Sequence, residues 1–357
     1  MTKLRKYLYL PALLYRLVIS LRNRLFDAGI LKERKFGVPI IAVGNITAGG
    51  TGKTPHTEYL IRLLKSHYRV AVLSRGYKRK TSGFVLADEK CTPKIIGDEP
   101  YQLYRKFPDI LVAVDENRRR GIETLLNMEK EKAPEVIILD DAFQHRYVKP
   151  GLSILLSDFN RPIYEDALLP VGLLREPLKG KERADIVIVT KCPEMINPVE
   201  ARMVERNLNL FPDQKLFFTS FRYGNLKALF PGAGQNDIEL GSLAKNTTVL
   251  LVTGIASPRP VADKIKSLGC RLEHLIYPDH YWYTKSDWNM VREKFSGIKS
   301  EKKIVMVTEK DAVRWIDCNF DDGDFKKNIY YLPIEVYFLQ QKENEFDHLI
   351  REYVRAN

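Results

Sequence analysis

Apolar and polar positions follow two rhythms along the first two-thirds of this chain. Short, mainly apolar runs predict strands at 38–43, 70–73, 110–114, 136–139, 152–156 and 186–190. Between several of these runs, apolar residues recur at helical spacing, as they do over 57–66, 100–106 and 119–129. Strands that alternate with helices predict a doubly wound, mainly parallel α/β sheet, which binds its ligands at the carboxyl ends of the strands.

The pattern changes after about residue 215. Further strands are expected at 216–223, 248–253, 272–277 and 304–307, with helices from 260 and over 286–295. A strand at 329–338 and a helix at 343–355 are expected to return toward the first domain. We therefore predict a core domain over 1–215, joined by 338–357, and a smaller α/β domain over 216–337. A cleft between two such domains is a common place for a substrate.

Composition narrows the choice of partners. The length of 357 residues suggests two domains, and 45% hydrophobic residues suffice for their cores. The cysteines are scattered and predict neither a disulfide framework nor a zinc site, which favours a reducing cytoplasm; they are Cys91, Cys192, Cys270 and Cys318. Lys and Arg outnumber Asp and Glu by 57 to 45, so the net charge of +12 favours an anionic partner. No nucleic-acid-binding motif is present, so we expect lipid or a phosphorylated substrate and no nucleic acid.

The N-terminus combines both properties. Residues 7–21 are almost wholly apolar, and basic residues flank or interrupt them, namely Lys3, Arg5, Lys6, Arg16, Arg22 and Arg24. The run is shorter than the roughly 20 residues that a membrane-spanning helix needs. It therefore predicts a helix that lies in a membrane interface, or alternatively one that packs on its own domain.

A glycine-rich segment follows the strand expected at 38–43 and precedes a helix. It reads Gly-Asn-Ile-Thr-Ala-Gly-Gly-Thr-Gly-Lys-Thr over residues 44–54, with a threonine where the strict nucleotide-binding pattern has its first glycine. Such loops cradle phosphates with backbone N–H groups, while the lysine reaches the outer phosphates and the last hydroxyl ligates Mg²⁺. The predicted nucleotide-binding residues are Thr47, Ala48, Gly49, Gly50, Thr51, Gly52, Lys53 and Thr54.

Two carboxylate motifs lie at or near the ends of expected strands and helices. Asp140 and Asp141 end the strand expected at 136–139, where a P-loop fold holds its Mg²⁺; alternatively they form a turn. Asp98 precedes a helical pattern and could cap it, or could deprotonate the acceptor of a phosphoryl transfer. The sequence pattern alone does not choose between these roles.

Basic residues and one histidine complete the candidates. Arginine-rich loops at 75–80, at 117–120 and near 175 could clamp phosphate, or could be solvated surface. His280 lies among aromatic residues, and an isolated histidine of this kind is more often structural than catalytic.

Taken together, these segments resemble the tetraacyldisaccharide 4′-kinase family, the lipid A 4′-kinases of Gram-negative bacteria. The resemblance runs from about Leu10 to about Arg314. Its specific motifs include Leu-Asp-Asp-Ala-Phe-Gln-His-Arg, and they cover 43–55, 73–77, 97–100, 139–146, 169–177, 254–258, 279–281 and 308–312.

The resemblance implies a membrane-associated enzyme that transfers the γ-phosphate of ATP to the 4′-hydroxyl of a lipid A disaccharide 1-phosphate, with Mg²⁺ as a cofactor. Asp98 becomes the base that activates the acceptor, His280 from the second domain becomes its partner, and Lys53 is catalytic. The Asp98–His280 pair would form only when the cleft closes, which would limit wasteful hydrolysis. The implied metal region comprises Thr54, Asp140, Asp141 and Glu176.

The same resemblance implies where the enzyme works and what it contacts. The expected location is the cytoplasmic face of the inner membrane, on its anionic surface, with no obligate protein partner. A substrate that carries its own phosphate would be contacted by the basic residues Arg75, Arg118, Arg119 and Arg146.

Two other functions fit parts of the sequence. A membrane-associated P-loop ATPase or GTPase, acting as a switch or chaperone, would hydrolyse rather than transfer. The guanine-reading pattern Asn-Lys-x-Asp is absent, however, because residues 190–193 read Thr-Lys-Cys-Pro. A membrane-bound scaffold without catalytic activity would leave the Lys-Thr loop and the paired aspartates unexplained.

Overall fold

The protein is described from a computed structural model, which covers residues 8–234, 236–243, 245–317 and 323–357. Its internal contacts divide the chain into two compact units. The first comprises Met1–Glu89, Leu103–Phe221 and Val336–Asn357, and the second comprises Lys90–Gln102 and Arg222–Glu335. The sequence-based division assigned 90–102 to the first domain, whereas this segment packs with the second unit.

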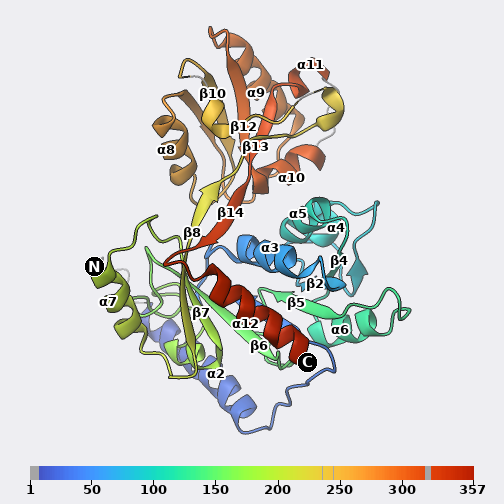
Figure 1. The fold of residues 1–357 in the computed structure, drawn as a ribbon, viewed down its shortest axis with the longest axis vertical. Coiled ribbons are helices and arrows are strands. Elements are labelled where there is room, and N and C mark those ends of the chain that lie inside the picture. Colours follow the sequence, from blue (N-terminus) through green and yellow to red (C-terminus); the bar gives the residue numbers. More distant parts are fainter. Residues whose placement is uncertain (1–7, 235, 244, 318–322) are drawn as a thin grey trace. The chain divides into compact units, whose positions relative to one another are not determined.

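The first unit is built on a large sheet whose described strands follow the order β14-β8-β7-β6-β1-β5-β2-β4-β3 (Figure 1). The strands are β1 Ile40–Gly44, β2 Val70–Ser74, β3 Val85–Leu86, β4 Leu111–Val114, β5 Val136–Asp140, β6 Leu152–Asp158, β7 Ile186–Thr190, β8 Lys215–Tyr223 and β14 Ile334–Phe338. Strand β1 pairs in parallel with β5 and β6, whereas the short β3 pairs antiparallel with β4. The predicted mainly parallel α/β sheet is confirmed.

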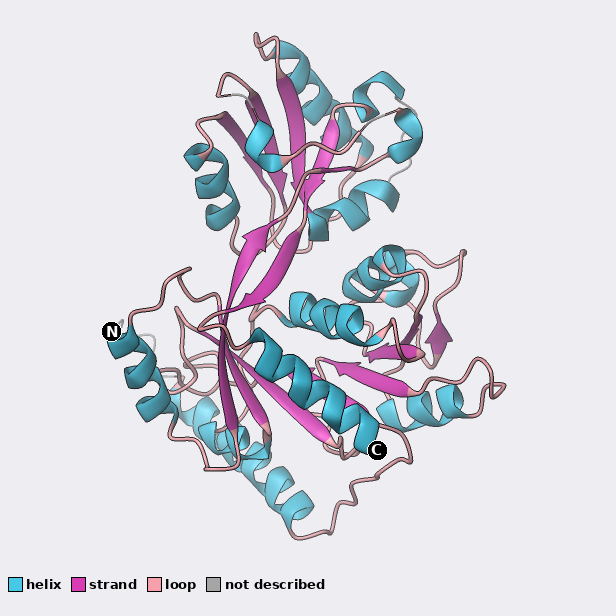
Figure 2. Ribbon diagram, viewed as in Figure 1, coloured by secondary structure: helices cyan, strands magenta, loops and turns pink. Residues whose placement is uncertain are grey.

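Helices bury both faces of this sheet (Figure 2). They are α3 Lys53–Leu64, α5 Asp98–Lys106 (of this unit from Leu103 on), α6 Arg118–Leu126, α7 Pro198–Leu208 and α12 Glu343–Ala356. In the N-terminal helix, α2 Tyr9–Asp27, the buried residues are Ala12 and Phe26. Along β1 the side chains alternate: Ile41 and Val43 pack with α3 and α12, whereas Ile40 and Ala42 pack on the opposite face with α6. A strand buried on both faces needs apolar residues throughout, which is why the expected strands read as continuous apolar runs.

The second unit has its own sheet, in the order β11-β10-β12-β13-β9. Its elements are α4 Pro93–Ile96, β9 Lys227–Ala228, β10 Thr248–Thr253, α8 Arg259–Ser267, β11 Arg271–Ile276, α9 Lys285–Gly297, β12 Lys303–Thr308, α10 Glu309–Asp317, α11 Gly323–Lys326 and β13 Ile329–Leu332. The pairing is parallel except between β13 and β9. This is the smaller α/β unit that the sequence predicts.

Some elements differ from the sequence expectation. The single strand expected at 329–338 is two strands, β13 and β14, because Pro333 between them has no N–H for a ladder. Helices α7 and α10 are not among the elements that the sequence pattern predicts. Helix α10 buries charged side chains, Asp311 and Arg314 among them, so its inner face does not read as an apolar stripe.

Candidate active site

The glycine-rich loop joins the end of β1, at Gly44, to the start of α3, at Lys53. Gly49 (φ +110°) and Gly52 (φ +87°) adopt left-handed backbone conformations that residues with a Cβ rarely accept. At Gly52 there is also no room for a side chain, because an added Cβ would lie 2.6 Å from the ring of Phe221. The helix therefore begins directly at the loop, and its N-terminal N–H groups are available to phosphate.

A second segment runs along the start of the loop. The Ala48 N–H donates to the carbonyl of Leu173 over 2.7 Å, and the Arg175 N–H donates to the carbonyl of Ile46, also over 2.7 Å. Between these bonds Thr47 is 2% exposed, so the residue at the irregular first position belongs to the packed base of the loop. The open part of the loop is consequently shorter than the predicted nucleotide-binding stretch.

The paired aspartates lie at the same sheet edge as the loop. Register places Asp140 opposite Val43 of β1, and Asp141 follows with a positive φ of 48°. The Thr57 hydroxyl donates to Oδ1 of Asp140 over 3.1 Å. Nζ of Lys53 lies 3.6 Å from Oδ1 of Asp141. The structure thus brings Lys53 and both aspartates together at the carboxyl ends of β1 and β5.

Glu176 does not join these aspartates. It is 2% exposed, Oε1 accepts from Nε2 of Gln144 over 2.9 Å, and Oε2 accepts from Arg183 over 2.8 Å. Within the described residues there is no group of three or more His, Cys, Asp or Glu side chains that could hold a metal ion. Glu176 therefore organises the segment around Arg183, and its metal role stays a prediction.

The arginines expected to contact the substrate form two sets that differ in where they lie and what they contact. Arg118 is 2% exposed and donates to the Asp115 carbonyl over 3.1 Å. Burial lowers its pKa to about 10, and the charges of Asp141 and Asp140 act in the opposite direction. Arg75 is exposed just after β2, and Arg119 is half-buried in the first turn of α6. These three lie at strand ends of the sheet that carries the loop.

Arg146 has different contacts. Its guanidinium lies 2.8 Å from Asp27 and 2.9 Å from Glu33, and 4.9 Å from the ring centroid of Phe26. All three partners belong to the end of α2 or to the residues just after it. In the structure this arginine fastens the N-terminal helix to the sheet.

Helix α2 has one anchored side and one exposed side. The Tyr15 hydroxyl donates to the Arg175 carbonyl over 2.7 Å, and Arg22 donates to the Gln144 carbonyl over 3.0 Å. Its exposed apolar residues are Tyr9, Leu10, Leu13, Leu14, Leu17, Val18 and Leu21. Of the basic residues expected around it, Lys3, Arg5 and Lys6 lie outside the described residues. No helix in the described part of the chain is long and apolar enough to cross a membrane.

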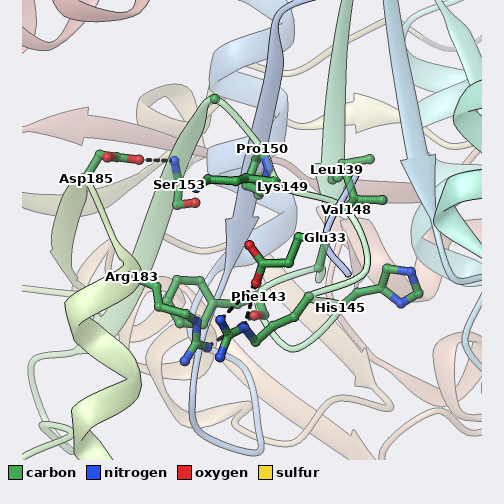
Figure 3. A pocket seen from close by; sticks show the side chains of 14 residues that line it. Glu33, Leu139, Phe143, His145, Val148, Lys149, Pro150, Ser153, Arg183 and Asp185 are labelled. Atoms are coloured by element: carbon green, nitrogen blue, oxygen red, sulfur yellow. Dashed lines mark hydrogen bonds and ion pairs between the residues drawn. The ribbon is translucent and has the colours of Figure 1, made fainter. Parts of the chain in front are cut away.

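A cavity of about 390 Å³ opens beside the loop after β5 (Figure 3). Its polar lining residues are Glu33, His145, Arg146, Lys149, Ser153, Arg183 and Asp185, and the others are apolar residues and Gly151. Arg146 is already paired with Glu33, and Arg183 with Glu176, so the two guanidinium groups serve internal ion pairs. None of residues 47–54 is among the described lining residues, which separates this cavity from the glycine-rich loop.

His56 supports the loop from the first turns of α3. It is 3% exposed, with Nδ1 2.7 Å from the Gly52 carbonyl oxygen and Nε2 3.0 Å from Oγ1 of Thr219. The carbonyl can only accept, so Nδ1 carries the hydrogen and the ring is neutral when Thr219 donates to Nε2. Burial lowers the pKa of His56 to about 4, from 6.5.

This lowered pKa predicts an acid-sensitive loop. His56 takes up a proton near pH 6.5 in the unfolded chain and near pH 4 in the folded chain. The contribution of neutral His56 to the free energy of unfolding is therefore complete above pH 6.5 and is lost as the pH falls toward 4. A shift of this size corresponds to roughly 3 kcal/mol. We expect the thermal midpoint of the wild type to fall more steeply between pH 6.5 and 4.5 than that of a His56→Asn variant. Parallel curves for the two proteins would contradict the assignment.

A separate cluster forms in the second unit around Asp98. Asp98 is the first residue of α5 rather than a cap before it, and its Oδ2 lies 2.8 Å from Nη2 of Arg314 and 3.1 Å from Nδ1 of His280. Because a carboxylate can only accept, Nδ1 of His280 carries the hydrogen. Nζ of Lys310 lies 3.2 Å from Nε2 of the same ring. The imidazole is therefore held between a carboxylate and an ammonium group.

The partners of Asp98 set its protonation. Burial alone would raise the pKa of the Asp98 carboxyl, but the hydrogen bond from His280 and the charge of Arg314 outweigh it and hold the pKa below its ordinary value. Asp98 is thus a carboxylate at neutral pH. Asp98 and His280 belong to the same compact unit, so the expectation that they come from different domains does not hold. An ion pair of 3.3 Å between Lys94 and Asp317 helps to fasten 90–102 to α10.

Sequence reasoning missed the two cations of this cluster, Lys310 and Arg314. The motif at 308–312 is visible in the sequence, but nothing local shows that it continues as a helix that reaches Asp98. Arg314 is fully buried, and a buried arginine requires a carboxylate partner. The neighbouring apolar residues Val313 and Trp315 were the available indication that this segment faces a core.

A strand, a glycine-rich loop, Lys-Thr at a helix start and carboxylates at the end of the next strand define a P-loop enzyme that uses a nucleoside triphosphate. Which P-loop enzyme follows from the match of residues 4–355 to the tetraacyldisaccharide-1-P 4′-kinase family. The chain belongs to this family.

Relatives across its whole length agree. The chain is 50% identical to the tetraacyldisaccharide 4′-kinase of Bacteroides thetaiotaomicron, covering 99% of this chain and 94% of that one. It is 51% identical to the enzyme of the same name from Phocaeicola vulgatus, covering 99% and 96%. Among solved structures it resembles that of LpxK from Aquifex aeolicus in complex with ATP, with a TM-score of 0.75 and 31% identity over 98% of this chain and 99% of that one.

Proposed function

We propose that this protein transfers the γ-phosphate of ATP to the 4′-hydroxyl of tetraacyldisaccharide 1-phosphate in lipid A biosynthesis. The observation that carries the proposal is the match to the kinase family along residues 4–355, which includes both the glycine-rich loop and the Asp98 cluster. The loop accounts for the phosphate donor, and the Asp98 cluster accounts for the acceptor.

On the donor side, the backbone N–H groups of the loop and the Lys53 ammonium bind the phosphates. Mg²⁺ prefers oxygen ligands and is usually held by one or two carboxylates together with phosphate oxygens and water, rather than by a full protein cage. The hydroxyl of Thr54 and the carboxylates of Asp140 and Asp141 are such oxygens at one sheet edge, so these residues fit the ion. When bound, Mg²⁺ neutralises charge that develops on the phosphates.

On the acceptor side, Asp98 accepts the proton of the 4′-hydroxyl. The hydroxyl oxygen forms a bond to the γ-phosphorus, the bond from that phosphorus to the bridging oxygen breaks, and ADP leaves with the electron pair. His280 and Arg314 orient the Asp98 carboxylate through Oδ2, which leaves Oδ1 for the hydroxyl. The phosphate of the substrate itself is contacted by Arg75, Arg118 and Arg119.

Label transfer tests this reaction directly. With γ-³²P-ATP and tetraacyldisaccharide 1-phosphate in mixed micelles, we expect radioactivity to move into the lipid at a rate that depends on lipid concentration. Release of inorganic phosphate without lipid should be slow by comparison. Rapid hydrolysis with no labelled lipid would instead favour the ATPase or GTPase switch.

The exposed face of α2 supports a peripheral location at the cytoplasmic face of the inner membrane. Apolar residues fill that face, while Tyr15, Arg22 and Phe26 hold the other side against the first unit. Such a helix lies in the interface with its apolar face among the acyl chains, and the net charge of +12 adds attraction to anionic lipid. The acyl chains of the substrate remain in the same bilayer.

Substitution on this face is a sharper test than deletion, because α2 also covers the first unit. We expect Leu13→Glu with Leu17→Glu to weaken binding to anionic vesicles by roughly 100-fold, since each leucine loses a burial of about 1.5–3 kcal/mol. Vesicle sedimentation measures this. A matched control is Ile276→Glu, which changes an apolar residue that is 66% exposed in the second unit. Equal binding by the double variant and the control would return α2 to a purely structural role.

A further inference from the structure

Side chains from outside the glycine-rich loop donate hydrogen bonds to three of its carbonyl oxygens. Nη2 of Arg161 donates to the carbonyl of Ala48 over 3.0 Å, and Nζ of Lys191 donates to that of Gly50. The Thr190 hydroxyl donates to the Thr51 carbonyl over 2.9 Å. The phosphate-binding roles proposed above use none of these three donors.

The donors come from the two strands that follow β1 in the sheet. Arg161 lies just after β6, Thr190 ends β7, and Lys191 is the next residue. Strand β6 pairs in parallel with both β1 and β7, so all three strands end at the edge where the loop begins. The position of the loop against this edge is thus a consequence of the strand order.

Lys191 is itself held in place. Its φ of +57° is unusual for a residue with a side chain, and such a conformation costs on the order of 1 kcal/mol. Nζ also pairs with Oδ2 of Asp158 over 2.6 Å, and the Asp158 side chain is only 12% exposed. An ion pair at the edge of the sheet therefore aims the ammonium group at the Gly50 carbonyl.

Fixing a carbonyl fixes an N–H group as well. A trans peptide is planar, and its C=O and N–H point in opposite directions. The bonds to the carbonyls of Ala48 and Thr51 consequently orient the N–H groups of Gly49 and Gly52. The bond to Gly50 orients the Thr51 N–H, which closes a tight turn onto the Gly49 carbonyl over 3.1 Å.

The N–H groups that remain are those a triphosphate needs. Within the described residues, the backbone N–H groups of Gly49, Gly50, Gly52, Lys53 and Thr54 donate no hydrogen bond. A glycine-rich loop without external bonds would have many accessible conformations and would lose that entropy on binding phosphate. Bonds on the outer side of the loop remove this cost before the ligand arrives.

We propose that Lys191, with Arg161 and Thr190, is a positioning residue for the triphosphate: it presets the peptide orientations of the glycine-rich loop by holding its carbonyl oxygens from outside. Lys191 is the one residue of the segment 190–193 that matches the lysine of the guanine-reading pattern Asn-Lys-x-Asp. Here it acts on the loop, so its effect is independent of the base. This role rests on nucleotide binding alone and does not depend on which residue activates the acceptor.

Competition binding to the full-length protein in detergent distinguishes a contact of Lys191 with the loop from a contact with the nucleotide base. Inhibition constants for ATP and for inorganic tripolyphosphate are measured against a fluorescent ATP analogue. We expect Lys191→Met to weaken both ligands by a similar factor, roughly tenfold or more, as the loss of a charged hydrogen bond implies. Lys191→Arg, which keeps a cationic donor, should recover most of the affinity. Lys65→Met is the matched control, because Lys65 pairs with Asp109 over 2.8 Å at the far end of α3.

A second measurement needs no nucleotide. In the ligand-free protein, we expect hydrogen exchange of the peptide that covers residues 48–54 to be faster in Lys191→Met and in the isosteric Thr190→Val than in the wild type. If Lys191→Met does not fold, Thr190→Val carries both measurements with a smaller loss. Loss of ATP affinity with tripolyphosphate affinity unchanged would show a base contact and overturn the proposal. Unchanged affinities with unchanged loop exchange would overturn it as well.

Discussion

Replacing Asp98 with asparagine should reduce phosphoryl transfer by roughly 10² to 10⁴-fold, the range that general base catalysis supplies, while ATP still binds. The structure holds the Asp98 carboxylate 2.8 Å from Arg314 and 3.1 Å from His280, with its pKa below the ordinary value. Asparagine keeps the shape but cannot accept a proton. ATP affinity should persist because the loop residues proposed to bind phosphate belong to the first unit, whereas Asp98 belongs to the second. Rates of label transfer and ATP dissociation constants measure the two effects separately.

The control for this variant must separate the loss of the base from the loss of a negative charge in the same cluster. Removal of the Asp98 charge leaves a fully buried guanidinium with less compensation, and uncompensated buried charge destabilises a protein. Glu99→Gln is the matched variant, because Glu99 is the neighbouring carboxylate and pairs with Lys310 over 3.5 Å. We expect Glu99→Gln to retain most of the transfer rate. Near-normal transfer by Asp98→Asn, or an equal loss in both variants, would contradict the assignment of Asp98 as the base.

Local sequence predicted the parts of this protein that local chemistry determines. A strand buried on both faces must be apolar throughout, so most strands of the large sheet were evident, with ends that shifted by a residue or two. The two-residue β3 was not expected, and β8 was assigned to the smaller domain. The loop at 44–54 was equally readable, because glycines followed by Lys-Thr between a strand and a helix are typical of phosphate-binding loops. The placement of Asp140 beside the loop followed from the parallel sheet, in which neighbouring strands end at one edge.

The remaining features depend on packing between distant segments. Nothing near Asp98 in the sequence indicates that Arg314, 216 residues away, becomes its partner. Segment 90–102 belongs to the second unit, where its charged residues form ion pairs with α10, such as Lys94 with Asp317. The periodicity of apolar residues does not predict such ion pairs. The resemblance implies that Arg146 contacts the substrate, and the sequence does not show that its guanidinium also pairs with Asp27 and Glu33 at the end of α2 and just after it. Charge identifies a side chain that needs a partner, but tertiary structure selects the partner.

Replacing Lys53 with methionine should lower the transfer rate by at least roughly 10² to 10³-fold, as expected for removal of one preorganised charge from a transition state. Nζ of Lys53 lies 3.6 Å from Asp141, and the side chain is only 12% exposed, so no solvent cation replaces it. Methionine keeps the aliphatic length, which preserves the packing of the first turn of α3. Lys53→Arg should not restore the rate, because a planar guanidinium is larger than an ammonium group and directs its hydrogen bonds differently. Transfer within a few-fold of wild type at saturating ATP would refute the phosphate role.

The two variants also test each other. In the proposed mechanism Lys53 stabilises charge on the donor and Asp98 removes a proton from the acceptor, so both residues would act on the same transition state. Groups that act as a unit are strongly non-additive. Once Lys53→Met has removed most of the rate, the added Asp98→Asn change should therefore cost much less than it does alone. Fully multiplicative losses would mean that the two residues stabilise different steps, and Asp98 would then act in binding the lipid rather than in the transfer itself.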